Sequence, residues 1–210
     1  MQNSIINELA EIFKRFPGIG PRQAKRFVYF LLQQDTTLHH RLTKLIAELP
    51  RLVSVCPDCR RFFQDGHDVD DNRSCPICCD QHRHNGQLLV IEKDADLEAI
   101  EKAGTYLGQY FVLGGLVPIL EKEPEKKIRI ASLIKQIEKL ASANQLSEVI
   151  LAFAVTTEAD HTIEYLKERL TGLVEKYHFQ FTLLGRGLSG GLEIEYSDPD
   201  TLKNALSNRH

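Results

Sequence analysis

Four cysteines occur as two short pairs whose spacing is typical of a metal site. The motifs Cys56-Pro57-Asp58-Cys59 and Cys75-Pro76-Ile77-Cys78 are separated by fifteen residues. A two-residue gap within each pair lets both sulfurs face one point, so two such pairs can enclose a metal ion. Zinc accepts four thiolates in a tetrahedron, which leaves no position for water. The pattern therefore predicts one structural zinc ion per chain, held by Cys56, Cys59, Cys75 and Cys78.

The alternatives for these cysteines are two disulfides or unrelated buried thiols. Residues 1–10 carry no basic leader and no long apolar run, so we expect a cytoplasmic protein without a membrane segment. Cytoplasmic thiols stay reduced, which favours the metal site. Cys79 follows the second pair and is interpreted as a bystander that could replace Cys78. The nearby His67, His82 and His84 are expected to be solvated loop residues.

A second pattern, near the N-terminus, has the form of a helix–hairpin–helix. Phe16-Pro17-Gly18-Ile19-Gly20-Pro21 interrupts one amphipathic helix and precedes another. Glycines let the backbone pass close to a phosphate, and the amides at the start of a helix attract anions. Such contacts bind the DNA backbone with little sequence preference. The predicted DNA-binding residues are Gly18, Gly20, Arg22, Lys25 and Arg26; the alternative is an ordinary turn between two helices.

The charge distribution favours the same end of the chain for a polyanion. The 210 residues carry a net charge of −3, but residues 1–55 hold eight Lys or Arg against four Asp or Glu. A basic excess of this size can steer nucleic acid to one region. A basic excess of this size is also common on solvated helices. It therefore supports the DNA-binding interpretation of the hairpin but does not establish it alone.

The secondary structure expected to position these residues differs between the start of the chain and the rest. Three helical patterns fill the first 50 residues, the third ending at Pro50. Short apolar runs then alternate with helical patterns. Strands are expected at residues 88–91, 110–113, 148–153 and 179–184, and helices at 94–103, 128–144, 162–177 and 200–206. This alternation predicts an α/β protein with a mostly parallel sheet covered on both faces, preceded by a small all-α unit.

Three carboxylates follow strands of this predicted sheet. Glu92 comes directly after the first strand, and Glu158 and Asp160 follow the third after a short loop. Ligands of open α/β sheets bind at the carboxyl ends of strands, where these acids could hold Mg²⁺. The alternative is a set of solvated loop acids. The glycine-rich loop 185–191 lacks a phosphate-loop signature and is either a flexible connection or a contact with DNA or another subunit.

The order of these elements resembles the RecR family of bacterial recombination mediators over nearly the whole chain. The resemblance is carried by FPGIGPRQAKRF (16–27), the two cysteine motifs, YFVLGG (110–115) and EYSDPDTLKNAL (195–206). It implies a helix–hairpin–helix domain at 1–53, a four-cysteine zinc finger at 54–84, a Toprim domain at 85–184 and a C-terminal segment at 185–210. The sequence departs from the family mainly in the Toprim loops: Glu92-Lys93-Asp94, residues 119–124 and residues 153–160.

The resemblance also implies a function. The family forms non-catalytic, ring-like oligomers, usually tetramers, that bind single- and double-stranded DNA. It acts with RecO and RecF in DNA repair, helping RecA load onto single strands. By this likeness Glu92, Glu158 and Asp160 belong to the surface that engages RecO. The competing hypothesis is a Mg²⁺-dependent Toprim nuclease or primase-like enzyme that uses the same three acids.

Overall fold

The computed structural model describes residues 4–64 and 73–185. The chain divides into two compact units, Met1–Val53 and Ser54–His210. None of the described helices combines the length and the apolarity that crossing a lipid bilayer requires. The boundaries of the four predicted domains stay predictions, and the predicted helix at 200–206 lies outside the described residues.

The first unit consists of three helices, α1 (Ile5–Phe13), α2 (Pro21–Leu32) and α3 (Thr36–Leu52). The helices α1 and α2 pack through a small apolar core, whose fully buried members are Ala10, Ala24 and Val28. The Asp35 side chain caps α3 by accepting a hydrogen bond from the Leu38 amide at 2.9 Å. No residue of α3 is buried, so most of its apolar face is left accessible.

The predicted end of the third helix at Pro50 is wrong. Pro50 lies inside α3, which continues to Leu52. A proline in the last turn removes one amide donor, and the next turn still closes because the Val53 amide donates to the Leu49 carbonyl. The apolar spacing therefore identified the helix correctly, while proline was too strong a stop signal.

The second unit begins with short elements around the cysteines. The strands β1 (Val53–Val55) and β2 (Phe62–Gln64) pair as a two-stranded sheet. They are followed in the described residues by α4 (Pro76–Cys79) and the 3-10 turn η1 (Gln81–Arg83). The four paired cysteines and Phe63 form their own buried cluster, with Ile77 packed against it.

A four-stranded parallel sheet forms the rest of this unit. Its strands are β3 (Gln87–Ile91), β4 (Gln109–Val112), β5 (Glu148–Ala152) and β6 (Gln180–Leu183), in the order β4-β3-β5-β6. In register, Val90 of β3 lies between Phe111 of β4 and Leu151 of β5. The predicted parallel sheet, with continuous apolar strands, is confirmed.

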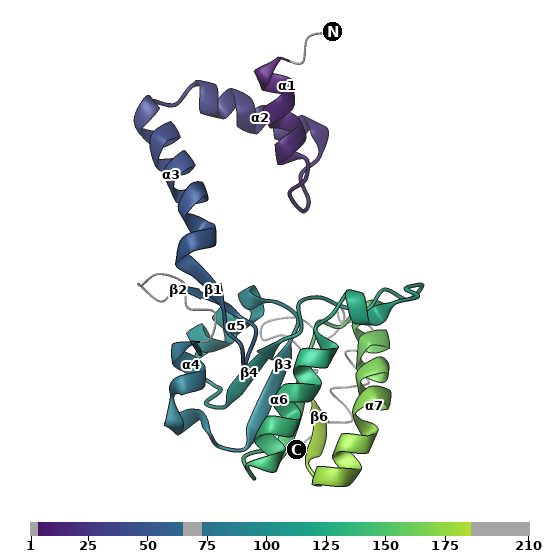
Figure 1. Cartoon of the computed structure of the whole chain (residues 1–210). Helices are drawn as coiled ribbons and strands as arrows, with labels where there is room; N and C mark the ends of the chain where they lie inside the picture. The colour runs from purple at the N-terminus through teal and green to yellow at the C-terminus, as the bar shows by residue number, and fades with distance from the viewer. Residues whose placement is uncertain (1–3, 65–72, 186–210) are drawn as a thin grey trace, which may run out of the picture. The chain divides into compact units, whose positions relative to one another are not determined.

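Helices cover both faces of the sheet (Figure 1), which is why its central strands are apolar on both sides. The helices α6 (Ile130–Ser142) and α7 (Thr157–Tyr177) share one core with alternate strand residues, including Val90 and Phe111. The helix α5 (Asp94–Ala103) packs through Leu97 on the other residues, including Tyr110. A 3-10 turn, η2 (Pro124–Lys126), precedes α6.

Candidate metal centre and nucleic-acid interface

The structure brings the four predicted cysteine ligands together in one buried cluster. Cys56 and Cys59 lie in the tight loop after β1, and Cys75 and Cys78 lie at the two ends of the first turn of α4. Their Sγ atoms all lie within 4.8 Å of one another. The sulfurs of Cys56 and Cys78 are 3.8 Å apart, and those of Cys59 and Cys75 are 3.6 Å apart.

These distances fit a tetrahedral metal ion and exclude disulfides. Zinc–sulfur bonds of about 2.3 Å place the sulfurs of a tetrahedron about 3.8 Å apart, whereas a disulfide requires about 2.05 Å. All four thiols are free. The Cys75 amide lies 3.3 Å from the Cys56 sulfur, which supports a thiolate there. The cluster thus has the ligand number, chemistry and size of a closed structural metal site.

The first cysteine loop needs an unusual backbone conformation to close. Arg60 has a positive φ of 65°, and its amide donates to the Cys56 carbonyl at 3.0 Å. In return the Cys56 amide donates to the Arg61 carbonyl at 2.9 Å. These bonds hold the chain in the left-handed region that a non-glycine residue rarely adopts, so the turn is fixed around the metal position.

Thiols this close share their protons. The pKa of Cys56 lies far below its usual range because neighbouring thiols, that of Cys59 first, hydrogen-bond to its sulfur. The pKa of Cys78 is raised because its thiol hydrogen-bonds to its neighbours, that of Cys56 first. A metal ion removes this competition by replacing the protons, so binding releases them to solvent.

The fifth cysteine and the nearby histidines lie outside the cluster. Cys79 is exposed, with its sulfur 3.5 Å from the Ser74 carbonyl. His82 is exposed as expected. The expectation for His84 is wrong: it is half-buried, with Nε2 3.4 Å from the Cys78 carbonyl and Nδ1 enclosed without a hydrogen-bond partner in the described chain. His67 falls outside the described residues.

The hairpin between α1 and α2 presents an open helix start. Gly18 has a φ of +74°, a conformation that favours glycine, and Gly20 is the extended N-cap residue of α2. A Cβ at either glycine would meet nothing within 4 Å. No side chain caps α2, so its first amides are available to an anion.

Three basic side chains extend from the same end of α2. Arg22, Lys25 and Arg26 are exposed, while Ala24 and Val28 are buried against α1. Residues at i, i+3 and i+4 share one helix face, so the three charges lie together away from the core. Open backbone amides beside such a face can bind phosphates without reading bases.

The three predicted acids lie at the carboxyl edge of the parallel sheet. Glu92 follows β3, and Glu158 and Asp160 lie in the first turn of α7. The chain leaves β3 towards β4 and leaves β5 towards β6, so a topological switch point separates these strand ends. The predicted start of α7 at Thr162 is wrong. The helix begins five residues earlier, at Thr157, because the Thr156 side chain caps it by accepting from the Ala159 amide at 3.2 Å.

These acids do not converge as the cysteines do. Among the described residues, the four cysteines are the one group of three or more Cys, His, Asp or Glu side chains that could share a metal ion. Glu158 instead lines a shallow hollow with Pro118, Ile119 and Leu120. The Leu120 side chain is 92% exposed.

The loop after β4, which carries these apolar residues, is anchored to α7 by a hydrogen bond. The Val117 amide donates to Thr162 Oγ1 at 2.8 Å, and Thr162 is fully buried in α7. The loop therefore displays Ile119 and Leu120 on a fixed base beside Glu158. This surface was not predicted from the sequence; the available signal was a pair of adjacent apolar residues in a segment bounded by Pro118 and Pro124.

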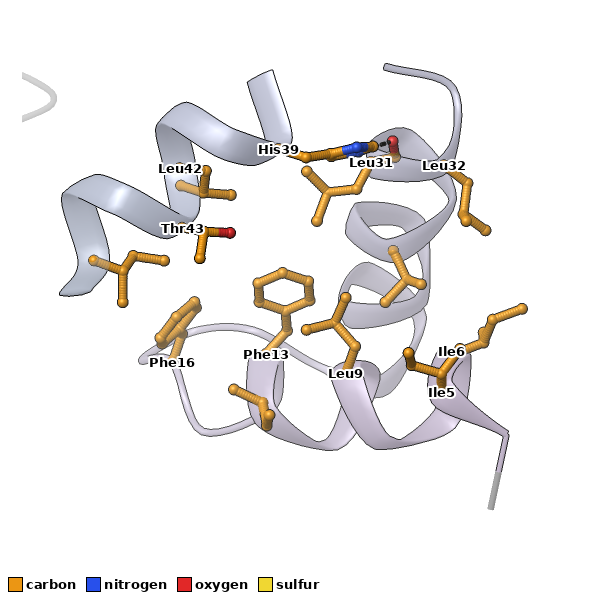
Figure 2. A pocket seen from close by; sticks show the side chains of 13 residues that line it. Ile5, Ile6, Leu9, Phe13, Phe16, Leu31, Leu32, His39, Leu42 and Thr43 are labelled. Carbon is orange, nitrogen blue, oxygen red and sulfur yellow. Dashed lines mark hydrogen bonds between the residues drawn. The ribbon is translucent and has the colours of Figure 1, made fainter. Parts of the chain in front are cut away.

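The first unit contains an apolar groove of about 560 Å³ between α1, α2 and α3 (Figure 2). Phe13 and Phe16 face it from one side, and Leu42 faces it from α3. His39 closes one end, with Nε2 2.7 Å from the Leu31 carbonyl. Several lining residues are exposed, including Ile5 (78%) and Ile46 (58%). Exposed apolar surface of this kind is typical of interaction sites.

Comparison with known proteins agrees with this arrangement. Residues 6–50 match the family model described as RecR, helix-hairpin-helix, and residues 86–181 match the Toprim domain model. Along the sequence, the four clustered cysteines, Cys56 to Cys78, lie between these two matched regions.

Curated relatives match over the full length. The chain is 35% identical to the recombination protein RecR of Hydrogenovibrio crunogenus over 210 residues, covering 100% of this chain and 98% of the relative. The Erythrobacter litoralis RecR is 35% identical with the same coverage. The Bacteroides thetaiotaomicron RecR is 34% identical over 94% of this chain and 89% of the relative. The chain therefore belongs to the RecR family of recombination proteins.

Proposed function

We propose that this protein is a DNA-binding recombination mediator in DNA repair and has no catalytic activity of its own. The observation that carries the proposal is the open start of α2, where Gly18 and Gly20 lie beside the exposed Arg22, Lys25 and Arg26. In this proposal the α2 amides and the three basic side chains hold backbone phosphates of single- or double-stranded DNA. Binding would be independent of sequence because no base edge is contacted.

The four-cysteine cluster holds one structural zinc ion in this proposal. Cys56, Cys59, Cys75 and Cys78 would complete the coordination shell, and the ion would supply folding energy and no chemical step. Among the described residues, Phe63 is the one buried apolar side chain that packs in this cluster besides the cysteines. The zinc ion would therefore supply the folding stability that this small apolar cluster cannot provide.

The Toprim domain serves as the partner surface, and the protein acts in the cytoplasm. Glu92, Glu158 and Asp160 would engage a RecO-like protein, and a RecF-like protein would act with it to promote RecA loading on single strands. Ile119 and Leu120 would add apolar contacts beside Glu158. In this proposal the chain comprises four domains, at residues 1–53, 54–84, 85–184 and 185–210.

Self-association as a dimer or tetramer completes the proposal. The apolar groove of the first unit supports it, because α3 buries no residue within its own chain. Mass measurement in solution, with and without DNA, tests this step. A single-chain mass at all working concentrations would contradict it.

The alternative is a Mg²⁺-dependent nuclease or primase-like enzyme. The Toprim sheet with acids at its carboxyl edge favours it, although the three acids do not gather around one point in the described structure. We would incubate the purified protein with labelled DNA and Mg²⁺. Binding without cleavage or synthesis is expected; turnover that disappears in Glu92→Gln would replace the mediator proposal by the enzyme.

A further inference from the structure

The metal-binding loop is hydrogen-bonded to the edge of the parallel sheet. The strand β4 is an edge strand in the order β4-β3-β5-β6. Its Val112 amide donates to the carbonyl of Cys59, one of the four cysteines, at 2.8 Å. An edge strand that lacks a partner exposes unpaired backbone groups. The cysteine loop supplies a hydrogen-bond acceptor for one of these groups at the end of β4.

Arg129 makes a second link between the same loop and the same strand. Its Nη1 donates to the Arg60 carbonyl at 2.8 Å and lies 3.3 Å from the Val112 carbonyl. Burial lowers the pKa of Arg129, and the nearby charge of Arg60 lowers it further. A partly desolvated guanidinium depends on these carbonyls, so the loop and the side chain hold each other in place.

A third link runs from the first cysteine pair to α6. Lys139 Nζ lies 2.5 Å from Asp58 Oδ1, and Ser74 Oγ donates to Asp58 Oδ2 at 2.6 Å. Asp58 lies between Cys56 and Cys59, and Ser74 precedes Cys75. One carboxylate therefore ties both halves of the metal site to a helix of the Toprim domain.

The strand end that receives these links also fixes the position of Glu92. The Gly114 amide donates to the Glu92 carbonyl at 2.9 Å, and the Leu113 amide donates to the Ile91 carbonyl at 2.8 Å. Gly114 has a φ of +90°, and a Cβ there would lie 3.0 Å from Arg129 Nε. The Cys59 carbonyl is thus connected to the Glu92 backbone by two hydrogen bonds and the short step from Val112, the last residue of β4, to Gly114.

We propose that the metal centre controls the carboxyl edge of the Toprim sheet, so that losing the ion releases the ends of β4 and β3 and disorders the surface around Glu92. Without an ion, the Cys56–Cys59 loop has little apolar contact to hold it. The Cys59 and Arg60 carbonyls would then leave Val112 and Arg129. Metal loss would switch off partner binding at this edge while the separate first unit keeps its DNA contacts. The loss of partner binding and the retained DNA contacts rest on the function proposed above.

Hydrogen exchange on the full chain tests the coupling without a partner. The zinc-loaded protein and protein stripped with a chelator are compared, with metal content measured in both. The amides of Val112 and Gly114 are expected to exchange at least about tenfold faster after stripping, as expected for a lost hydrogen bond. The central strand β5, through Val149 and Leu151, should keep its protection. Unchanged exchange at Val112, or equal loss of protection throughout the sheet, would overturn the proposal.

A pair of lysine variants tests the same coupling with the metal present. Lys139→Ala removes the contact with Asp58, whereas Lys135→Ala removes an exposed lysine one turn earlier in α6. Lys139→Ala should speed exchange at Val112 and transfer of zinc to a chromogenic chelator, and Lys135→Ala should change neither. Equal behaviour of the two variants would contradict the proposed link.

Binding to the cognate RecO-like protein and to an oligonucleotide separates this inference from the proposed function. Stripped protein should lose RecO binding and retain DNA binding. Retained RecO binding after complete stripping would overturn the switch. Failure of the zinc-loaded protein to bind RecO would instead refute the proposed partner, and the exchange result would still decide the coupling to the sheet edge.

Discussion

Arg83 and Glu101 form a bidentate ion pair, with nitrogen–oxygen distances of 2.9 and 2.7 Å. The Tyr110 hydroxyl donates to the same carboxylate at 2.6 Å. Arg83 ends the metal-binding segment, Glu101 lies in α5 and Tyr110 lies in β4. The side chains of the pair are 17% and 27% exposed, so this contact joins the segment that carries the cysteines to the Toprim domain and is partly shielded from solvent.

Replacing Arg83 should destabilise the second unit. Arg83→Ala leaves the partly buried Glu101 carboxylate without its cation, and we expect a loss of about 2 kcal/mol. Thermal unfolding monitored by circular dichroism measures the effect. Lys126→Ala is the control, because the Lys126–Glu123 pair is exposed (71% and 62%) and should contribute little. Equal effects of the two variants would contradict a structural role for the buried pair.

The same pair predicts a pH dependence. Burial alone would raise the pKa of Glu101, but hydrogen bonds from Arg83 and Tyr110 hold it below its ordinary value of 4.5. Because the pKa of Glu101 is lower in the folded state than in the unfolded state, the ionised carboxylate stabilises the protein at pH values above the unfolded-state pKa. This contribution is lost as the pH falls through the folded-state pKa. A carboxyl carbon NMR titration of Glu101 should give a midpoint below 4.5. A midpoint at or above 4.5 would show that burial dominates.

Removing a metal ligand should loosen or unfold the second unit without altering a chemical step. Cys56→Ser and Cys75→Ser are each expected to lose the zinc ion and to lower Tm by about 10 °C or more, since several kcal/mol of binding energy support folding. Metal analysis and thermal scans measure both effects. Cys79→Ser is the control and should keep one zinc per chain, because Cys79 lies outside the cluster. Zinc loss with unchanged Tm would count against a structural metal.

Charge reversal on α2 should weaken DNA binding at every sequence. Lys25→Glu removes one phosphate contact and adds repulsion, so the slope of log Kd against log salt should flatten by about one. Fluorescence anisotropy with several unrelated oligonucleotides measures both quantities. Lys44→Glu makes the same charge change on an exposed site of α3 and should have the smaller effect. Unchanged binding by Lys25→Glu would remove the hairpin from the interface.

A charge in the apolar groove of the first unit should reduce self-association. Ile46→Glu places a carboxylate among the groove-lining residues, and burying it in an interface would be costly. Light scattering over a concentration series should show a shift to smaller species. Leu45→Glu is the matched control, because Leu45 neighbours Ile46 on α3 but does not line the groove. An unchanged mass for Ile46→Glu would place the interface elsewhere.

Much of the fold follows from local sequence patterns. The apolar run at 88–91 and the helix at 94–103 match β3 and α5 closely, because each is short and bounded by polar residues. The predictions failed at boundaries set by a single side chain or bond. Thr156 caps α7 before its apolar face begins, and α3 continues past Pro50. Capping depends on which amides lack partners, which spacing alone does not reveal.

The metal site was the most predictable part of the molecule. Two residues between cysteines fix a tight turn, and four thiolates fix the chemistry, so the ligand set required no tertiary information. The hairpin was predictable for a similar reason, since Gly18 and Gly20 act through local backbone conformation. Both motifs are complete within short stretches of sequence.

The sequence by itself thus determined the ligand set, the basic hairpin and the order of strands and helices. Only the tertiary structure decided that Cys59 and Val112 are joined, that Arg129 links the cysteine loop to the sheet, and that Glu92, Glu158 and Asp160 do not gather around one point. The physical reason is separation along the chain. Local motifs depend on neighbouring residues, whereas a contact between residues 59 and 112 depends on how a strand, a loop and a helix pack together.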